Sequence, residues 1–174
     1  MNMNFLGKTN KRGFSLVETI IYVAFFAGLI SAMIFGLAVS FKAYAFTRAK
    51  RQISIDANLA IERIVREVRQ ASSINDGSSS FGVNPGVLVL NSIDTSGNPV
   101  TVKFSVVNDV ISVTENSVLV GGITSGFTDV ENLTFTKLTT PVGAGVKIDL
   151  RVRSTKGVSN TADFHNTAML RGAY

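Results

Sequence analysis

An uncharged apolar stretch at residues 19–41 constrains the fold of this chain more than any other feature. It holds twenty-three residues without an Asp, Glu, Lys or Arg. At about 1.5 Å per residue, a helix of this length reaches roughly 35 Å, slightly more than the roughly 30 Å hydrocarbon core of a bilayer. Buried helices of soluble proteins are rarely apolar on every side over such a length. The stretch therefore predicts a membrane-spanning helix.

Basic residues precede this stretch. Lys8, Lys11 and Arg12 lie ahead of it with no acidic residue among them, and such a flank keeps the N-terminus of a membrane protein in the cytoplasm. The rest of the chain is then expected outside the plasma membrane. Without these three residues, 14 basic residues remain beside 12 acidic ones. The positive charge therefore does not point to nucleic acid as a primary partner.

A removable signal peptide is the alternative reading, because Ala43-Tyr44-Ala45 offers an A-x-A cleavage pattern after the apolar stretch. The apolar regions of such peptides run to about 7 to 15 residues. This stretch is much longer and has a carboxylate, Glu18, near its start, which favours a helix that stays in the chain.

Composition removes most catalytic and metal-binding chemistry. The chain has no Cys and a single His, His165. Disulfides, Cys-ligated metals, thiol nucleophiles and His clusters are therefore excluded, and His165 is expected to be a structural or surface residue. The G-x-S-x-G, H-E-x-x-H and phosphate-loop patterns are also missing. We expect neither an enzyme nor a bound cofactor or metal, and no catalytic residue is assigned.

A short motif lies at the start of the apolar stretch, where residues 11–18 read Lys-Arg-Gly-Phe-Ser-Leu-Val-Glu. This resembles the processing motif of type IV pilins and of type II secretion pseudopilins, in which a basic leader ends in Gly and Glu is fifth in the mature chain. The resemblance implies that prepilin peptidase cuts between Gly13 and Phe14 and N-methylates Phe14. Gly suits such a bond because it lets the chain extend in a tight cleft. Cleavage would also remove the basic anchor of the helix.

Glu18 has two readings, because a carboxylate in an apolar span is costly and usually has a partner. In the first, it is an interfacial residue that reaches the headgroup layer. In the second, it pairs with the Phe14 amine of a neighbouring subunit and sets the register of stacked helices during filament assembly. The family resemblance favours the second reading.

Small residues recur at every fourth position of the apolar stretch, and such a stripe allows close helix packing in lipid. They are Ala24, Gly28, Ala32, Gly36 and Ser40. The alternative is ordinary composition, since Gly and Ala are common in spanning helices. Many major pilins have a Pro kink where this chain has Phe35, so a bend or melted turn near Gly28 or Gly36 is the remaining option.

Beyond the membrane segment, one apolar face continues in helical spacing, with charged residues mostly off it, Asp56 included. The face is formed by Ala57, Ile61, Ile64, Val68 and Ala71. Clustered Ser, Asn, Asp and Gly residues then predict that the helix ends near Ser73. The amphipathic continuation accordingly covers residues 42–74.

Short alternating apolar runs follow and predict antiparallel strands. They cover residues 87–93, 100–107, 110–114, 117–123, 132–138 and 146–153, with a last strand at 164–170. Asn108-Asp109 and Glu115-Asn116 are expected to form tight turns, and the three Pro residues fall outside the runs.

These segments predict an α+β chain with four parts: a basic leader at 1–13, a transmembrane helix at 14–41, an amphipathic helix at 42–74 and a sheet domain at 75–174. One long N-terminal helix packed on an antiparallel β-sheet is the pilin architecture. The later helix and strands are similar to minor pilins of the group that includes the J-type pseudopilins.

The expected function is that of a structural subunit, a minor pilin, of a type IV pilus-like filament. The alternatives are a pseudopilin of type II protein secretion and a signal-anchored extracellular binding protein. By resemblance, the partners are other pilin subunits, prepilin peptidase, a membrane assembly platform and membrane lipid. The chain would begin in the bacterial inner membrane and end in an extracellular pilus or a periplasmic pseudopilus. The candidates for a binding patch are Arg151, Arg153 and Lys156. Because Arg151 and Arg153 are alternate residues of one predicted strand, they point to the same side, and such residues more often form a solvated face.

Overall fold

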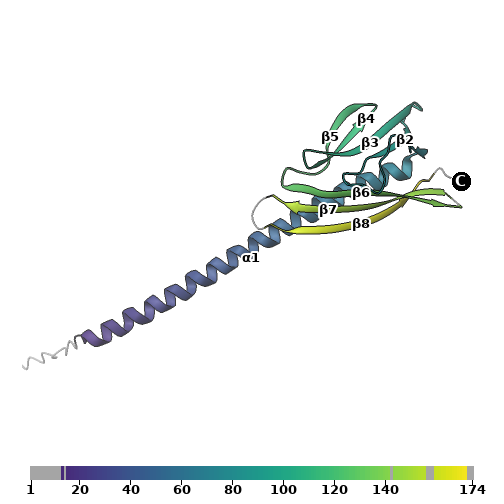
Figure 1. The fold of residues 1–174 in the computed structure, drawn as a ribbon. Coiled ribbons are helices and arrows are strands. Elements are labelled where there is room, and N and C mark those ends of the chain that lie inside the picture. Colours follow the sequence, from purple (N-terminus) through teal and green to yellow (C-terminus); the bar gives the residue numbers. More distant parts are fainter. Residues whose placement is uncertain (1–12, 14, 142, 156–158, 172–174) are drawn as a thin grey trace, which may run out of the picture. The chain divides into compact units, whose positions relative to one another are not determined.

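The computed structural model describes residues 13, 15–141, 143–155 and 159–171. In this part of the chain one helix, α1 (Leu16–Gln70), precedes eight β-strands (Figure 1). The chain divides into two compact units, of which the first ends at Ala43 and the second begins at Tyr44. The first unit contributes only the N-terminal part of α1, whereas the second contains the rest of α1 and all of the strands.

The first five strands form one antiparallel sheet in sequential order. They are β1 (Ser73–Ile74), β2 (Leu88–Ile93), β3 (Pro99–Val107), β4 (Val110–Glu115) and β5 (Val118–Gly122). Two turns in this sheet contain paired residues of positive φ, namely Asn108 with Asp109 and Asn116 with Ser117. Such pairs form the type I′ turns that match the twist of a β-hairpin.

The last three strands form a second antiparallel sheet, also in sequential order. They are β6 (Thr128–Thr140), β7 (Gly143–Ser154) and β8 (Thr161–Met169). Along β7 buried and exposed residues alternate, so one face of this sheet points to the core and the other to solvent.

A single hydrophobic core joins the second part of α1 to both sheets. The predicted apolar face of the helix is confirmed, since Ala57, Ile61, Ile64, Val68 and Ala71 are all buried. The same core holds Phe104 and Leu88 from the first sheet and Phe135 and Ile148 from the second. The second unit is therefore held together by burial of one helix face against two sheets.

The expected α+β class, with a long N-terminal helix on antiparallel strands, is confirmed. The expectation of a single sheet is wrong, because β5 and β6 do not pair. The backbone of β6 pairs instead with the segment before β2, where the Gly82 and Gly86 amides donate to the carbonyls of Phe135 and Leu133 over 2.8 and 2.7 Å. This edge of β6 is thus already occupied by backbone hydrogen bonds, which strand alternation along the sequence does not reveal.

Several boundaries also differ from the sequence prediction. The helix ends at Gln70 rather than near Ser73, because the Ser72 amide already donates to the Asn91 carbonyl of β2. One tight turn is Asn116-Ser117 rather than Glu115-Asn116. Pro99 is the first residue of β3 rather than a loop residue, a position where a strand tolerates a missing amide proton.

Candidate functional site

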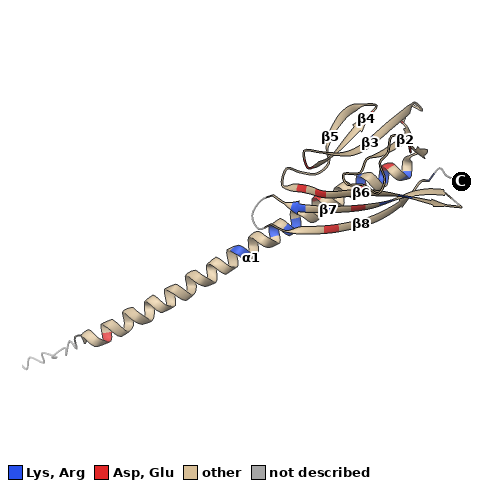
Figure 2. Ribbon diagram, in the orientation of Figure 1, with Lys and Arg blue, Asp and Glu red and all other residues tan. Residues whose placement is uncertain are grey.

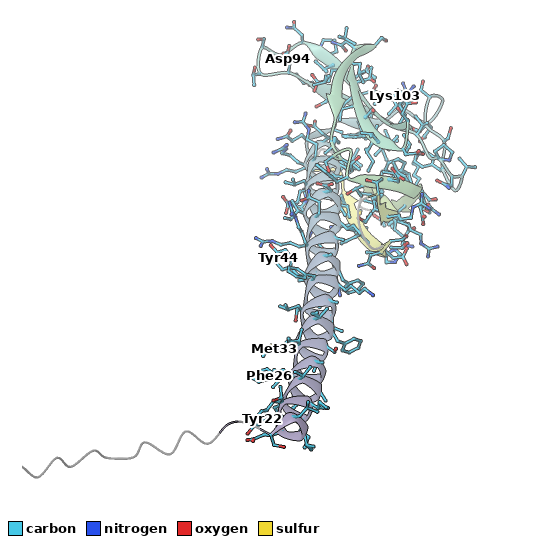
Figure 3. The ribbon with its side chains drawn as sticks, turned by 90° about the vertical axis from the view of Figure 1, so that its left-hand side faces the viewer. Tyr22, Phe26, Met33, Tyr44, Asp94 and Lys103 are labelled. Atoms are coloured by element: carbon cyan, nitrogen blue, oxygen red, sulfur yellow. The ribbon has the colours of Figure 1, made fainter. Side chains whose placement is uncertain are left out.

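The N-terminal part of α1 exposes apolar side chains on every side. It is long and apolar enough to cross a membrane, and its most apolar window has no buried residue. After the one acidic residue near its start, α1 shows a long stretch without charge (Figure 2). Phe26 and Met33, 61% and 61% exposed, project from the helix surface (Figure 3). Because exposure of such a surface to water is unfavourable, this part of α1 is better suited to lipid or to neighbouring helices.

Glu18 lies in the first turn of α1 and is partly exposed. The hydroxyl of Tyr22, one turn further along, donates a hydrogen bond to Glu18 Oε1 over 3.0 Å. Sequence reasoning assigned no role to Tyr22, although its i+4 spacing places it on the same side of the helix. One donor cannot satisfy a carboxylate, which offers about four acceptor positions. Glu18 therefore retains capacity for a second partner.

The stripe of small residues is exposed over its full length and is free to approach another helix. Ala24, Gly28, Ala32, Gly36 and Ser40 are all exposed, and α1 continues without a break through both glycines. A Cβ atom added at Gly28 or Gly36 would meet no atom of the described chain within 4 Å. The Ser40 hydroxyl donates to the Gly36 carbonyl over 2.9 Å, which satisfies this polar group within the helix.

Gly13 is exposed and precedes the first helical residue. Other described residues therefore do not cover Gly13, the residue expected before the scissile bond. Phe14, the expected site of methylation, lies outside the described residues. The structure consequently leaves the pairing of Glu18 with the Phe14 amine as an expectation.

A buried carboxylate that the sequence analysis placed off the apolar face connects α1 to the second sheet. Asp56 is 5% exposed. Its Oδ2 atom accepts hydrogen bonds from the hydroxyls of Ser125 (2.5 Å) and Thr128 (2.7 Å), and its Oδ1 atom accepts one from Gln52 Nε2 (3.1 Å). These neutral donors compensate the buried charge. Asp56 therefore positions the β5–β6 connection against the helix.

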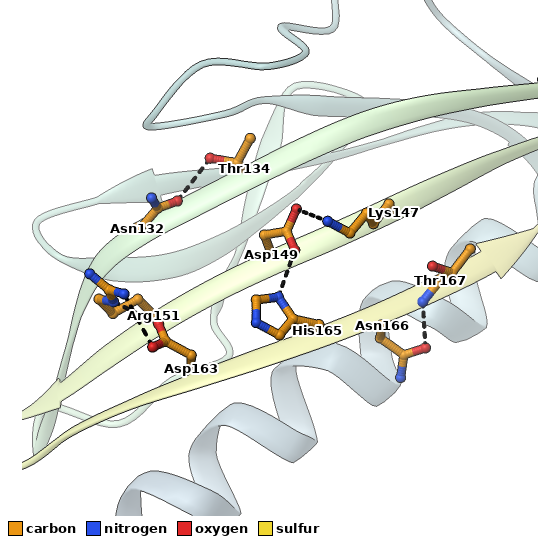
Figure 4. Close-up of polar contacts among 9 residues, drawn as sticks. All are labelled: Asn132, Thr134, Lys147, Asp149, Arg151, Asp163, His165, Asn166 and Thr167. Carbon is orange, nitrogen blue, oxygen red and sulfur yellow. Dashed lines mark hydrogen bonds and ion pairs between the residues drawn. The ribbon is translucent and has the colours of Figure 1, made fainter.

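Charged residues cover the outer face of the second sheet (Figure 4). Asp149 Oδ2 accepts from Lys147 Nζ over 3.0 Å, and Asp149 Oδ1 lies 2.6 Å from His165 Nδ1. Burial by itself raises the pKa of the Asp149 carboxyl, but Lys147 and His165 together hold this pKa below its usual value through hydrogen bonds and charge. His165 is thus an exposed surface residue that contacts the Asp149 carboxylate.

The two arginines considered for a binding patch are also paired with acids on this face. Arg151 makes two hydrogen bonds to Asp163, of 2.6 and 3.1 Å (Figure 4), and these lower the pKa of the Asp163 carboxyl. Arg153 contacts Asp129 and Glu131, each over 3.3 Å. Lys156 lies outside the described residues. Because these acids compensate the arginines, the face offers little net positive charge for binding an anion.

A smaller apolar surface lies on β5, the edge strand of the first sheet. Val118, Leu119 and Val120 are 68%, 64% and 60% exposed. An uncharged edge strand is unusual in a chain that remains single, because its unpaired backbone groups can accept another strand. Sequence reasoning identified the strand but not its exposure.

No family model, characterised protein sequence or solved structure matches this chain.

Proposed function

We propose that this chain is a structural subunit of a type IV pilus-like filament, most similar in kind to a minor pilin. One observation carries the proposal: a basic segment and Gly13 precede an exposed apolar helix whose first turn contains a carboxylate, Glu18, five residues after Gly13. The resemblance of this motif to prepilins supplies the function. The fold supplies a helix whose two parts have different surroundings.

The two parts of α1 match the two environments that a filament subunit meets. The first unit exposes apolar side chains all round and suits lipid before assembly and neighbouring helices after it. The second part of the helix buries one face against the sheets of its own chain. Filament assembly requires an exported domain joined to a helix whose contacts change from lipid to protein.

Glu18 would fix the axial register between neighbouring subunits during assembly. A carboxylate that keeps a free acceptor position in an apolar surrounding gains most from a charged partner. Cleavage after Gly13 would create such a partner, the Phe14 amine, on each mature subunit. Tyr22 then holds the carboxylate in place while the second acceptor position receives the amine of a neighbour.

Mass spectrometry of the intact protein, extracted from membranes of cells with and without prepilin peptidase, tests the proposal. We expect a chain that begins at N-methylated Phe14 in the first case and an uncut chain in the second. A matched variant, Gly13→Leu, should insert in the membrane and remain uncut, since insertion depends on the apolar stretch and its basic flank. A mature chain that begins at Phe46 would show ordinary signal peptidase cleavage and refute the proposal.

A further inference from the structure

Basic residues follow the apolar stretch without any compensating acid. Between Glu18 and Asp56 the sequence contains no acidic residue, whereas Lys42, Arg48, Lys50 and Arg51 are basic. In the second unit Arg48, Lys50 and Arg51 are exposed. Among the described residues, no ion pair involves any of these three side chains. Asp56 does not offset them, because it is buried and bound by neutral donors.

A cavity of about 490 Å³ lies at this end of the second unit. Its lining includes Tyr44, Arg48 and Gln52 from α1, Phe127 from the β5–β6 connection and Ser154 from the end of β7. Tyr44 and Phe127 are 69% and 46% exposed, and Tyr44 is marked on the helix in Figure 3. The cavity thus combines one guanidinium group with two aromatic side chains. Guanidinium groups bind phosphate through two parallel hydrogen bonds, and Tyr is enriched at the membrane interface.

The position of these residues along α1 corresponds to the headgroup layer. Tyr44 and Arg48 follow Phe41, the last residue of the apolar stretch, by three and seven positions. At about 1.5 Å per residue, they lie roughly 5 and 10 Å further along the helix axis. Headgroups add about 5 to 8 Å to each side of the hydrocarbon core. A stretch slightly longer than the core tilts to fit it, which keeps Tyr44 within the headgroup layer and Arg48 next to it.

We infer that this cavity binds the headgroup of an anionic phospholipid in the leaflet from which the domain emerges. Arg48 binds the phosphate, and Tyr44 and Phe127 pack against the glycerol and the first methylenes of the acyl chains. Arg51 and Lys50 add attraction that a zwitterionic lipid does not satisfy, since each nearby basic side chain strengthens binding to an anionic surface. The inference rests on the membrane insertion of α1 in the proposed function, but on neither cleavage nor filament assembly.

Native mass spectrometry of the full-length chain in a non-ionic detergent tests this site. The chain is incubated with equal amounts of phosphatidylglycerol and phosphatidylcholine of identical acyl chains, and the bound lipid is counted. We expect phosphatidylglycerol to be retained preferentially. Arg48→Gln should reduce its retention about fivefold, the effect of losing one basic contact. The matched variant Arg69→Gln removes the same charge from an exposed position elsewhere on α1 and should retain the lipid.

Three outcomes would overturn the inference. Equal retention of the two lipids would show that the cavity does not select for charge. An equal loss in Arg48→Gln and Arg69→Gln would show attraction by overall charge instead of a site. Displacement of phosphatidylglycerol by inorganic phosphate, but not by chloride at the same ionic strength, would assign the cavity to a free anion. The uncut Gly13→Leu variant should show the same lipid preference, so failure of processing and failure of this site are distinguished.

Discussion

The hydroxyl of Tyr22 donates a hydrogen bond to the carboxylate of Glu18, one helical turn away, over 3.0 Å. Both residues lie in the N-terminal part of α1, where the exposed side chains are mostly apolar. This contact lowers the cost of a carboxylate near lipid without satisfying it fully. In the proposed filament, Tyr22 would support Glu18 within its own helix, and the amine of a neighbouring subunit would supply the remaining contact.

Glu18→Ala should insert and be processed normally but enter filaments poorly. Removing an intramembrane Glu eases insertion, by up to about 3 kcal/mol at a helix centre and less near the interface. Assembly should suffer because the amine of the neighbour loses its partner in apolar surroundings, which commonly costs a few kcal/mol. Membrane fractionation and immunoblots of sheared filaments separate these steps.

The control Tyr22→Phe keeps the carboxylate and loses one hydrogen bond of about 1 kcal/mol, so its assembly defect should be smaller. Normal incorporation of Glu18→Ala would identify the carboxylate as an interfacial residue only.

Asp56→Asn should destabilise the second unit by about 1 to 3 kcal/mol, since hydrogen bonds to a buried charged group are strong. The amide presents an N–H group where Oδ2 or Oδ1 now accepts from Thr128, Ser125 or Gln52. Thermal unfolding of the full-length chain in detergent, followed by circular dichroism, measures the change. The control is Asp76→Asn, which removes an exposed ion pair with Lys137 and should cost less than about 1 kcal/mol. Equal losses in the two variants would remove the special role of Asp56.

The second unit should lose stability in acid through the outer face of its second sheet. Asp149 and Asp163 both have pKa values below their usual range. The ion pairs therefore contribute fully above the unfolded pKa of about 4, and the contribution is lost as the pH falls through the lower folded values. Urea unfolding at a series of pH values measures this slope. The double variant Asp149→Asn, Asp163→Asn should show a flatter decline below about pH 4, whereas an unchanged slope would assign the acid sensitivity to other carboxylates.

Residues 44–174 should fold without the first unit. The hydrophobic core consists of residues from Ile53 to Leu170 and includes none from the first unit. Deletion of residues 1–43 removes mainly exposed apolar surface, so the product should be soluble, with circular dichroism typical of mixed helix and strand. A product that keeps helical signal but shows no strand signal would mean that the sheets depend on the membrane segment.

The sequence predicted the elements of this fold because each one carries its own local pattern. Uncharged residues over a bilayer's thickness indicated a helix able to span a membrane, and a 3.6-residue period indicated the buried face that includes Ile61 and Ile64. Alternation along the chain located the strands to within a few residues, although β6 and β7 begin earlier than predicted, at Thr128 and Gly143. The roles proposed for Gly13 and Glu18 also rest on local spacing, because they depend on the distance of these residues from the apolar stretch.

Only the tertiary structure decided how distant segments pair. Asp56 was placed off the apolar face because it is charged, yet it is buried, since hydroxyl groups 69 and 72 positions away compensate its charge. The strands were predicted as one sheet, yet they form two, because hydrogen bonds from Gly82 and Gly86 occupy β6. Periodicity along a chain reports which side of an element is buried. It contains no information on which remote donor will satisfy a buried acceptor, because that depends on distances that exist only after the chain has folded.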